Sequence, residues 1–186
     1  MILALVGESA SGKTTTANMF AESDMGFKKV ITYTTRPPRE GEKDGFDYYF
    51  ISDQKFEYLA NKSLFLEKAK YRGWDYGSAI DLNTKDNLVV VLTPAGARAL
   101  KKAAEKVERE DVFIVYIKVD RRIRLMKLLG RGDDIDESYR RNLSDVGMFD
   151  GFENEANYTV YNDYFIKNPK KVFEEIKNVI GVNMNG

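Results

Sequence analysis

The residues best suited to chemistry lie near the start of the chain, in one short run. That run is Gly7-Glu8-Ser9-Ala10-Ser11-Gly12-Lys13-Thr14, followed by Thr15. Its spacing, G-x-x-x-x-G-K-[S/T], is typical of a turn whose backbone N–H groups surround a phosphate group. Lys13 brings a mobile positive charge to β- and γ-phosphates, and the Thr14 hydroxyl is a suitable oxygen ligand for Mg²⁺. We call residues 7–14 the phosphate loop and predict that it binds a nucleoside triphosphate.

The segments on either side of the phosphate loop support this prediction. Residues 2–6 are all apolar and have the length of a buried parallel strand, whereas residues 15–22 lack Gly and Pro and favour a helix. A helix that begins at the loop adds the partial positive charge of its N-terminus. The alternative is a glycine-rich turn without a ligand, which this order of strand, loop and helix disfavours.

A second group of candidate residues lies in a proline-stiffened loop over residues 34–46, which we call the arginine loop. Arg36 and Arg39 stand three residues apart around Pro37-Pro38, so two planar guanidinium groups can bind one phosphate. The phenols of Tyr48 and Tyr76 can donate to the same group. The alternative is that both arginines are merely solvent-facing charges.

Composition excludes several kinds of active site. The 186 residues suffice for one well-buried core, and the absence of Cys and His removes thiol nucleophiles, disulfides and an imidazole base. The formal net charge of zero disfavours a nucleic-acid partner. No segment approaches the roughly 20 apolar residues of a membrane span, and the first residues do not form a signal peptide. We therefore expect a cytoplasmic protein.

Alternating strand and helix patterns predict an α/β fold with a doubly wound parallel sheet. Strands are expected at 2–6, 28–32, 87–92, 112–119 and 158–161. Helices are expected at 15–22, 95–108, 121–129, 137–146 and 169–180. Shorter strands at 47–52, 64–71 and 74–77, with a helix at 53–60, indicate an inserted α+β subdomain over about 33–80.

Beyond the phosphate loop, several segments closely resemble the guanylate kinase family. They are Thr34-Thr35-Arg36-Pro37-Pro38-Arg39-Glu40-Gly41-Glu42, Gly45-Phe46-Asp47-Tyr48, Phe65-Leu66-Glu67, Tyr76-Gly77-Ser78, Gly130-Arg131-Gly132 and Val160-Tyr161-Asn162-Asp163. The resemblance covers about residues 2–180. It implies one domain over 1–186 with three parts: a P-loop core (about 1–32, 81–125 and 147–186), a GMP-binding insertion (33–80) and a mobile lid (126–146). It also implies transfer of a phosphoryl group from ATP to GMP with Mg²⁺, no nucleic-acid or membrane partner, and a monomer or homodimer.

The resemblance assigns roles to individual residues. The residues implied to bind ATP are Gly7, Glu8, Ser9, Ala10, Ser11, Gly12, Lys13, Thr14, Thr15 and Asn162. Those implied to bind GMP are Thr32, Arg36, Arg39, Tyr48, Glu67, Tyr76 and Ser78. The residues implied to be catalytic are Lys13, Arg36, Arg131 and Arg141, and Thr14 is the expected metal ligand. Glu67 is the candidate for specificity, because a carboxylate accepts from both N1–H and the 2-amino group of guanine, whereas adenine presents an acceptor at N1; the alternative is a surface glutamate on a strand.

The lid leaves one assignment open. Asn142 stands where the family has its second lid arginine, so either Arg141 takes that role or the role is absent. Arg121, Arg122 and Arg124 are expected to form an exposed basic face.

Two departures from the family pattern bear on function. Glu8 replaces a proline in the phosphate loop, and its side chain is expected to point outward. Val91 and Thr93 replace the acidic residues of D-x-D-x-x-G, which affects Mg²⁺ coordination and acceptor contacts.

The alternatives to a guanylate kinase are a related kinase with another acceptor, for instance a deoxynucleotide, and a non-catalytic module that binds a phosphorylated partner. The retained Lys13, Thr14 and Arg131 disfavour the second.

Overall fold

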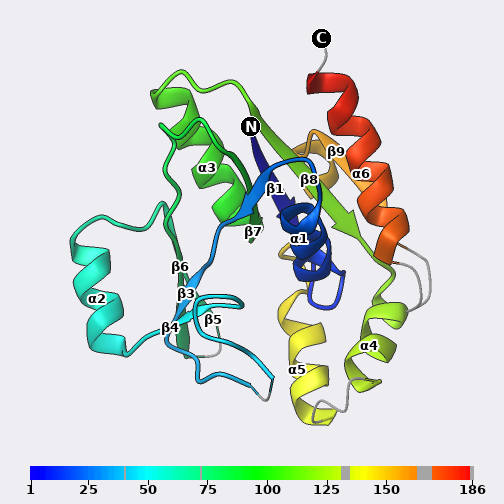
Figure 1. Cartoon of the computed structure of the whole chain (residues 1–186). Coiled ribbons are helices and arrows are strands. Elements are labelled where there is room, and N and C mark those ends of the chain that lie inside the picture. The colour runs from blue at the N-terminus through cyan, green and yellow to red at the C-terminus, as the bar shows by residue number, and fades with distance from the viewer. Residues whose placement is uncertain (40, 72, 131–134, 163–168, 185–186) are drawn as a thin grey trace.

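The computed structural model describes residues 1–39, 41–71, 73–130, 135–162 and 169–184, with side chains except at 71, 137, 141 and 182–184. Its centre is a five-stranded parallel sheet in the order β2-β7-β1-β8-β9 (Figure 1). The strands are β1 (Ile2–Val6), β2 (Phe27–Lys29), β7 (Asn87–Leu92), β8 (Val112–Lys118) and β9 (Tyr158–Tyr161). The predicted parallel-sheet core is confirmed.

Helices cover both faces of this sheet because each strand presents alternate side chains to opposite sides. In β1, Leu3 and Leu5 face α1 (Lys13–Glu22) and α6 (Pro169–Met184), whereas Ile2, Ala4 and Val6 face α3 (Pro94–Lys106) and η1 (Phe152–Asn154). All five β1 residues are fully buried. The strand that leads into the phosphate loop is therefore fixed on both sides.

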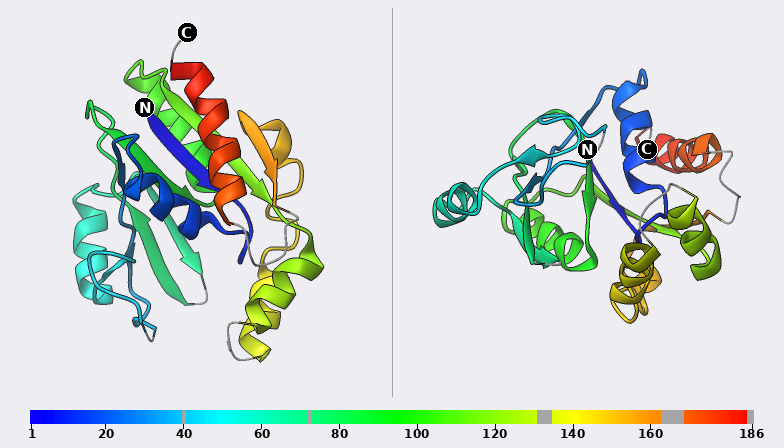
Figure 2. Two further views of the ribbon diagram at one scale, coloured as in Figure 1. Left: turned by 45° about the vertical axis from the view of Figure 1, so that its right-hand side comes forward. Right: turned by 90° about the horizontal axis from the view of Figure 1, so that it is seen from below.

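A second sheet, in the order β4-β3-β6-β5, lies beside the core (Figure 2). It comprises β3 (Tyr33–Thr34), β4 (Tyr49–Phe50), β5 (Glu67–Tyr71) and β6 (Trp74–Ser78), with α2 (Asp53–Asn61) packed nearby. The sequence patterns predict no strand at β3, because they place Thr34 in the arginine loop and Tyr33 in no element. Two residues give no periodic signal, and β3 forms because Tyr33 and Thr34 pair with β6 on one side and with β4 on the other.

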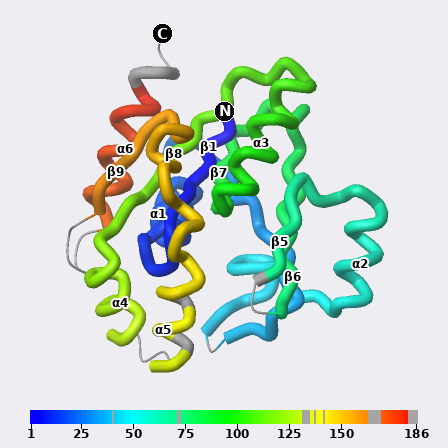
Figure 3. Tube along the Cα trace, turned by 180° about the vertical axis from the view of Figure 1, so that it is seen from behind, coloured from blue at the N-terminus to red at the C-terminus, as the bar shows by residue number. Residues whose placement is uncertain are grey.

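Two further helices, α4 (Arg121–Leu129) and α5 (Ile135–Ser144), lie side by side below the core. The tube seen from behind shows the second sheet on one side of the view and the α4–α5 pair on the other (Figure 3). In the described part of the chain, no helix has both the length and the apolar character needed to cross a membrane.

Candidate nucleotide-binding site

The phosphate loop joins β1 to α1 by a turn that side chains would obstruct. A Cβ atom on Gly7 would lie 2.5 Å from the Ile117 carbonyl oxygen and 2.6 Å from the Ser11 hydroxyl. Gly12, the N-cap of α1, has φ of 101°, a left-handed conformation that favours glycine. The geometry of the turn therefore requires glycine at both Gly7 and Gly12.

Lys13 and Asn162 hold the loop from two directions. The Lys13 ammonium donates to the Glu8 carbonyl oxygen at 2.7 Å. The buried Asn162 side chain donates to the Ser11 carbonyl oxygen at 3.0 Å. Thr14 and Thr15 are exposed in the first turn of α1. Asn162 thus contacts the phosphate loop itself, and the exposed Thr14 hydroxyl is accessible to a ligand.

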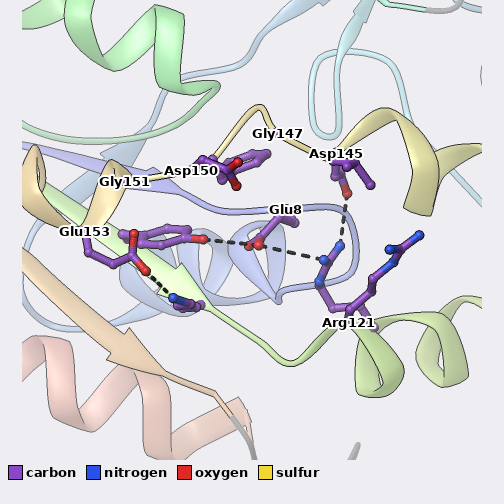
Figure 4. A pocket seen from close by; sticks show the side chains of 12 residues that line it. Glu8, Arg121, Asp145, Gly147, Asp150, Gly151 and Glu153 are labelled. Atoms are coloured by element: carbon purple, nitrogen blue, oxygen red, sulfur yellow. Dashed lines mark hydrogen bonds and ion pairs between the residues drawn. The ribbon is translucent and has the colours of Figure 1, made fainter.

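The outer side of the phosphate loop carries an ion network that sequence analysis missed. The buried Glu8 side chain points away from the loop, where its Oε1 accepts from Tyr116 at 3.1 Å and lies 3.7 Å from Arg124 Nη2 (Figure 4). Arg124 Nη1 also donates to Asp145 at 3.2 Å. Burial, together with the Glu8 carboxylate, raises the pKa of Tyr116, so its phenol stays protonated and donates.

The predicted exposed basic face is wrong for Arg124. Arg121 and Arg122 are exposed, but Arg124 is only 5% exposed and lies under α4 against the two carboxylates. Three arginines within four residues of the helix predicted at 121–129 are typical of a solvent-exposed face. The partner carboxylates lie far away in the sequence, so no local signal identified the pair.

In the arginine loop, Glu42 holds both predicted arginines. The buried Arg36 guanidinium donates to both Glu42 oxygens, at 2.8 and 2.9 Å, and stacks over Tyr48 with 5.3 Å from its central carbon to the ring centroid. Glu42 also accepts the backbone N–H of Arg39 at 2.7 Å. The Arg39 side chain is 46% exposed. Glu42 had no predicted role, although a carboxylate three residues after Arg39 was a usable signal.

The tyrosines of this loop lie beside Arg36. Tyr48 and Tyr76 have ring centroids 6.1 Å apart. Burial raises the pKa of Tyr48, followed by a smaller effect of Tyr76, so Tyr48 remains a hydrogen-bond donor at neutral pH. The structure therefore brings Arg36, Tyr48 and Tyr76 together.

The predicted base-recognition residues also form one cluster. Glu67 and Ser78 are directly opposed in β5 and β6, and the Ser78 hydroxyl lies 3.4 Å from Glu67 Oε1 and 3.5 Å from the Thr32 hydroxyl. The Thr93 hydroxyl lies 3.3 Å from Glu67 Oε2 and accepts the Gly96 N–H, which caps α3. Burial raises the pKa of Glu67, and the hydrogen bonds from Thr93 and Ser78 oppose that shift. Thr93, an observed departure from the family pattern, therefore supports Glu67.

Gly96 offers a test of this cluster. A Cβ at Gly96 would lie 2.2 Å from Glu67 Oε2, so the Gly96→Ala variant must displace the carboxylate. Because alanine favours a helix by about 1 kcal/mol over glycine and the displaced group is a flexible side-chain end, we expect an unchanged or higher Tm. If Glu67 binds GMP, as the resemblance implies, KM for GMP should rise about 10-fold, since the displaced carboxylate loses a charge-assisted hydrogen bond. Steady-state kinetics measures the KM, and thermal unfolding measures the Tm.

The matched control is Gly181→Ala in α6, where the added methyl group meets nothing within 4 Å. It should leave KM unchanged. If Gly96→Ala also left KM unchanged, Glu67 would not contact the acceptor.

Of the predicted lid residues, Arg131 lies outside the described residues. Arg141 belongs to α5, but its side chain also lies outside them. Asn142 is buried and accepts from Arg121 Nε of α4 at 2.5 Å. Asn142 therefore ties α5 to α4, and the choice of a second lid arginine stays a prediction.

A strand, glycine turn and helix on a parallel sheet, with a separate arginine-bearing sheet beside it, define the class of P-loop nucleotide-binding α/β proteins. The family model described as guanylate kinase matches residues 1–179. The chain belongs to the guanylate kinase family and is thus a nucleoside monophosphate kinase.

Individual relatives agree with this assignment. The chain is 31% identical to a guanylate kinase of Rickettsia typhi over 181 residues, which cover 95% of this chain and 90% of the relative. It is 32% identical to a guanylate kinase of Haemophilus influenzae, over 89% of this chain and 82% of the relative. The crystal structure of guanylate kinase from Anaplasma phagocytophilum is similar in fold, with a TM-score of 0.67 and 22% identity, over 98% of this chain and 85% of that one.

Proposed function

We propose that this chain transfers the γ-phosphoryl group of ATP to GMP, and to dGMP, giving ADP and GDP or dGDP. The observation that carries the proposal is the Glu67 cluster. The partly buried Glu67 carboxylate has one oxygen 3.4 Å from the Ser78 hydroxyl and the other 3.3 Å from the Thr93 hydroxyl, and it stands on the sheet whose β3 leads into the arginine loop. The pair of hydrogen-bond donors on guanine fits such a carboxylate.

The chemistry requires two polyanions to approach each other. An oxygen of the GMP phosphate attacks the γ-phosphorus, and the bond from that phosphorus to the β–γ bridging oxygen breaks. Lys13 and the phosphate-loop N–H groups hold the donor phosphates, whereas Arg36 and Arg39 hold the acceptor phosphate. No general base is required, since the acceptor phosphate is already largely ionised near pH 7. The absence of His is therefore compatible with the reaction.

The donor set of the site fits a magnesium ion carried mainly by the nucleotide. Among the described residues, no group of three or more acidic side chains is placed to hold a metal. The exposed Thr14 hydroxyl supplies one hard oxygen, and Mg²⁺ commonly takes its other ligands from phosphates and water. When bound, the ion would neutralise charge on the β- and γ-phosphates.

We also propose that the three parts implied by the resemblance act separately. The five-stranded sheet with its helices binds ATP, the second sheet over about 33–80 binds GMP, and residues 126–146 close over both as a lid carrying Arg131 and Arg141. The cytoplasmic location and the monomeric or homodimeric state stay predictions.

A coupled assay with ATP, Mg²⁺ and a panel of GMP, dGMP, AMP and UMP tests the proposed function. We expect GMP and dGMP to be the best acceptors. A different best acceptor would favour the related kinase with altered specificity. Binding of GMP without any turnover would favour the non-catalytic module.

The raised pKa of Glu67 gives a pH test of guanine recognition. The ionised carboxylate accepts from N1–H with one oxygen and from the 2-amino group with the other, whereas the protonated carboxyl group accepts with only one oxygen. Protonation below the raised pKa should therefore weaken the preference for GMP over IMP, which lacks the 2-amino group. We therefore expect the ratio of kcat/KM for GMP to that for IMP to fall as pH decreases. Taking the ratio cancels the titration of the phosphates, which both nucleotides share.

The Glu67→Gln variant is the control for this profile. Its ratio should be low and independent of pH, because glutamine does not titrate. A wild-type ratio that stays constant with pH would exclude Glu67 from guanine recognition.

A further inference from the structure

The network on the outer side of the phosphate loop has a function beyond packing. We propose that Arg124 and Asp145 are positioning residues that hold the phosphate loop in its nucleotide-binding shape and connect it to the α4–α5 pair. The proposal rests on the proposed function in so far as the loop binds ATP. Neither residue would touch the nucleotide.

The first contact fixes the backbone of the loop. The Ser9 N–H donates to Asp145 Oδ2 at 2.8 Å, and the Ser9 hydroxyl lies 3.4 Å from Oδ1. This N–H is directed to Asp145 and is not available to a phosphate. Because a peptide unit is planar, fixing the Ser9 N–H also fixes the direction of the preceding carbonyl group, that of Glu8. This carbonyl is the acceptor for Lys13.

The second contact balances charge. Glu8 and Asp145 are both buried carboxylates, and one guanidinium, that of Arg124, lies against both. Arg124 Nε also donates to the Val119 carbonyl oxygen at 3.2 Å, which fixes the plane of the fork. Glu8 Oε2 has no hydrogen-bond partner within the described residues. Glu8 therefore depends on Arg124 and Tyr116, and without Arg124 the two carboxylates would repel each other across the loop.

The third contact reaches the helices α4 and α5. Arg124 stands on α4 and Asp145 follows the last residue of α5, so the pair joins both helices to the loop. The network borders a pocket of about 370 Å³, seen in Figure 4, which Asp150 and Gly151 also line. A movement of α4 and α5 would therefore change the hydrogen bond to Ser9.

The test compares nucleotide binding in folded variants by titration calorimetry with ADP and with GMP, beside thermal unfolding. Asp145→Ala removes the acceptor for Ser9, and we expect ADP affinity to fall about 10-fold while GMP affinity stays the same. Asp145→Asn keeps an acceptor oxygen and should restore most of the ADP affinity. Asp150→Ala removes an exposed aspartate from the same pocket and is the matched control, with no change in either affinity.

Charge balance is tested by a pair of variants. Arg124→Gln should weaken ADP binding and lower the Tm, because it leaves the Glu8 and Asp145 carboxylates without their shared cation. Adding Glu8→Gln should recover part of both losses, because it removes the negative charge of Glu8. If Arg124→Gln does not fold, Asp145→Ala and Asp145→Asn still decide the proposal.

The inference would be overturned by ADP affinity within twofold of wild type in folded Asp145→Ala, or by equal losses for ADP and GMP, which indicate a general structural role. Failure of the wild type to bind ADP would also overturn it. Failure of the wild type to phosphorylate GMP would refute the proposed function alone, because the binding measurements need no turnover.

Discussion

Lys13→Ala should lower kcat by about 10³-fold or more, which is the largest effect we expect from a single substitution. The lysine is the mobile cation of the phosphate loop, and its loss leaves the charge that develops between donor and acceptor phosphates poorly compensated. The fold should persist, because the hydrogen bond from the Lys13 side chain to the Glu8 carbonyl oxygen is worth only about 1 kcal/mol. A Tm decrease of about 2–4 °C corresponds to that loss.

The measurement is steady-state kinetics at saturating ATP and GMP, beside thermal unfolding. Lys101→Ala, on the exposed face of α3, removes the same charge far from the phosphate loop and should retain wild-type kcat. Near-normal turnover of Lys13→Ala would show that residues 7–14 do not hold the transferred phosphate.

Arg39→Ala should lower kcat/KM for GMP by about 10- to 100-fold, with little change in KM for ATP. A guanidinium that binds phosphate contributes about 1.5–3 kcal/mol through charge-assisted hydrogen bonds. The Arg39 side chain is half-exposed, and Glu42 contacts its backbone N–H, so the loop should keep its shape without the side chain. The loss should therefore concern the acceptor rather than stability.

Arg98→Ala provides the matched control, because Arg98 is also a half-exposed arginine that pairs with a glutamate, Glu155. It should not change either KM. Equal kinetics for Arg39→Ala and wild type would assign the acceptor phosphate to other residues.

The core and the phosphate loop could be predicted because their signals are local. An apolar run, two glycines at fixed spacing and a helix-forming segment follow one another within residues 2–22, and the structure contains β1, the turn and α1 in that order. Helical periodicity also accounts for the exposed Lys101 and Lys102 of α3 and for the buried Val172 and Ile176 of α6.

The contacts that support the site could not be predicted, because they join distant segments. Thr93 supports Glu67 across 26 residues, and Asp145 binds Ser9 across 136 residues. Neither pair leaves a pattern in any short window of sequence. A resemblance to a family assigns roles only to residues that match the family pattern. Glu8 and Thr93 differ from that pattern, and their roles depend on their contacts with Tyr116 and Arg124 and with Glu67.

The bond from Asn162 to Ser11 spans 151 residues and has a consequence for biosynthesis. During synthesis Ser11 leaves the ribosome 151 residues before Asn162, which follows β9. A nascent chain therefore contains the phosphate loop long before the hydrogen bond from Asn162 to Ser11 can form. The hydrogen bond from Asn162 can therefore form only after β9 has been synthesised, and a nucleotide that binds the phosphate loop would stabilise the folded chain from that point on.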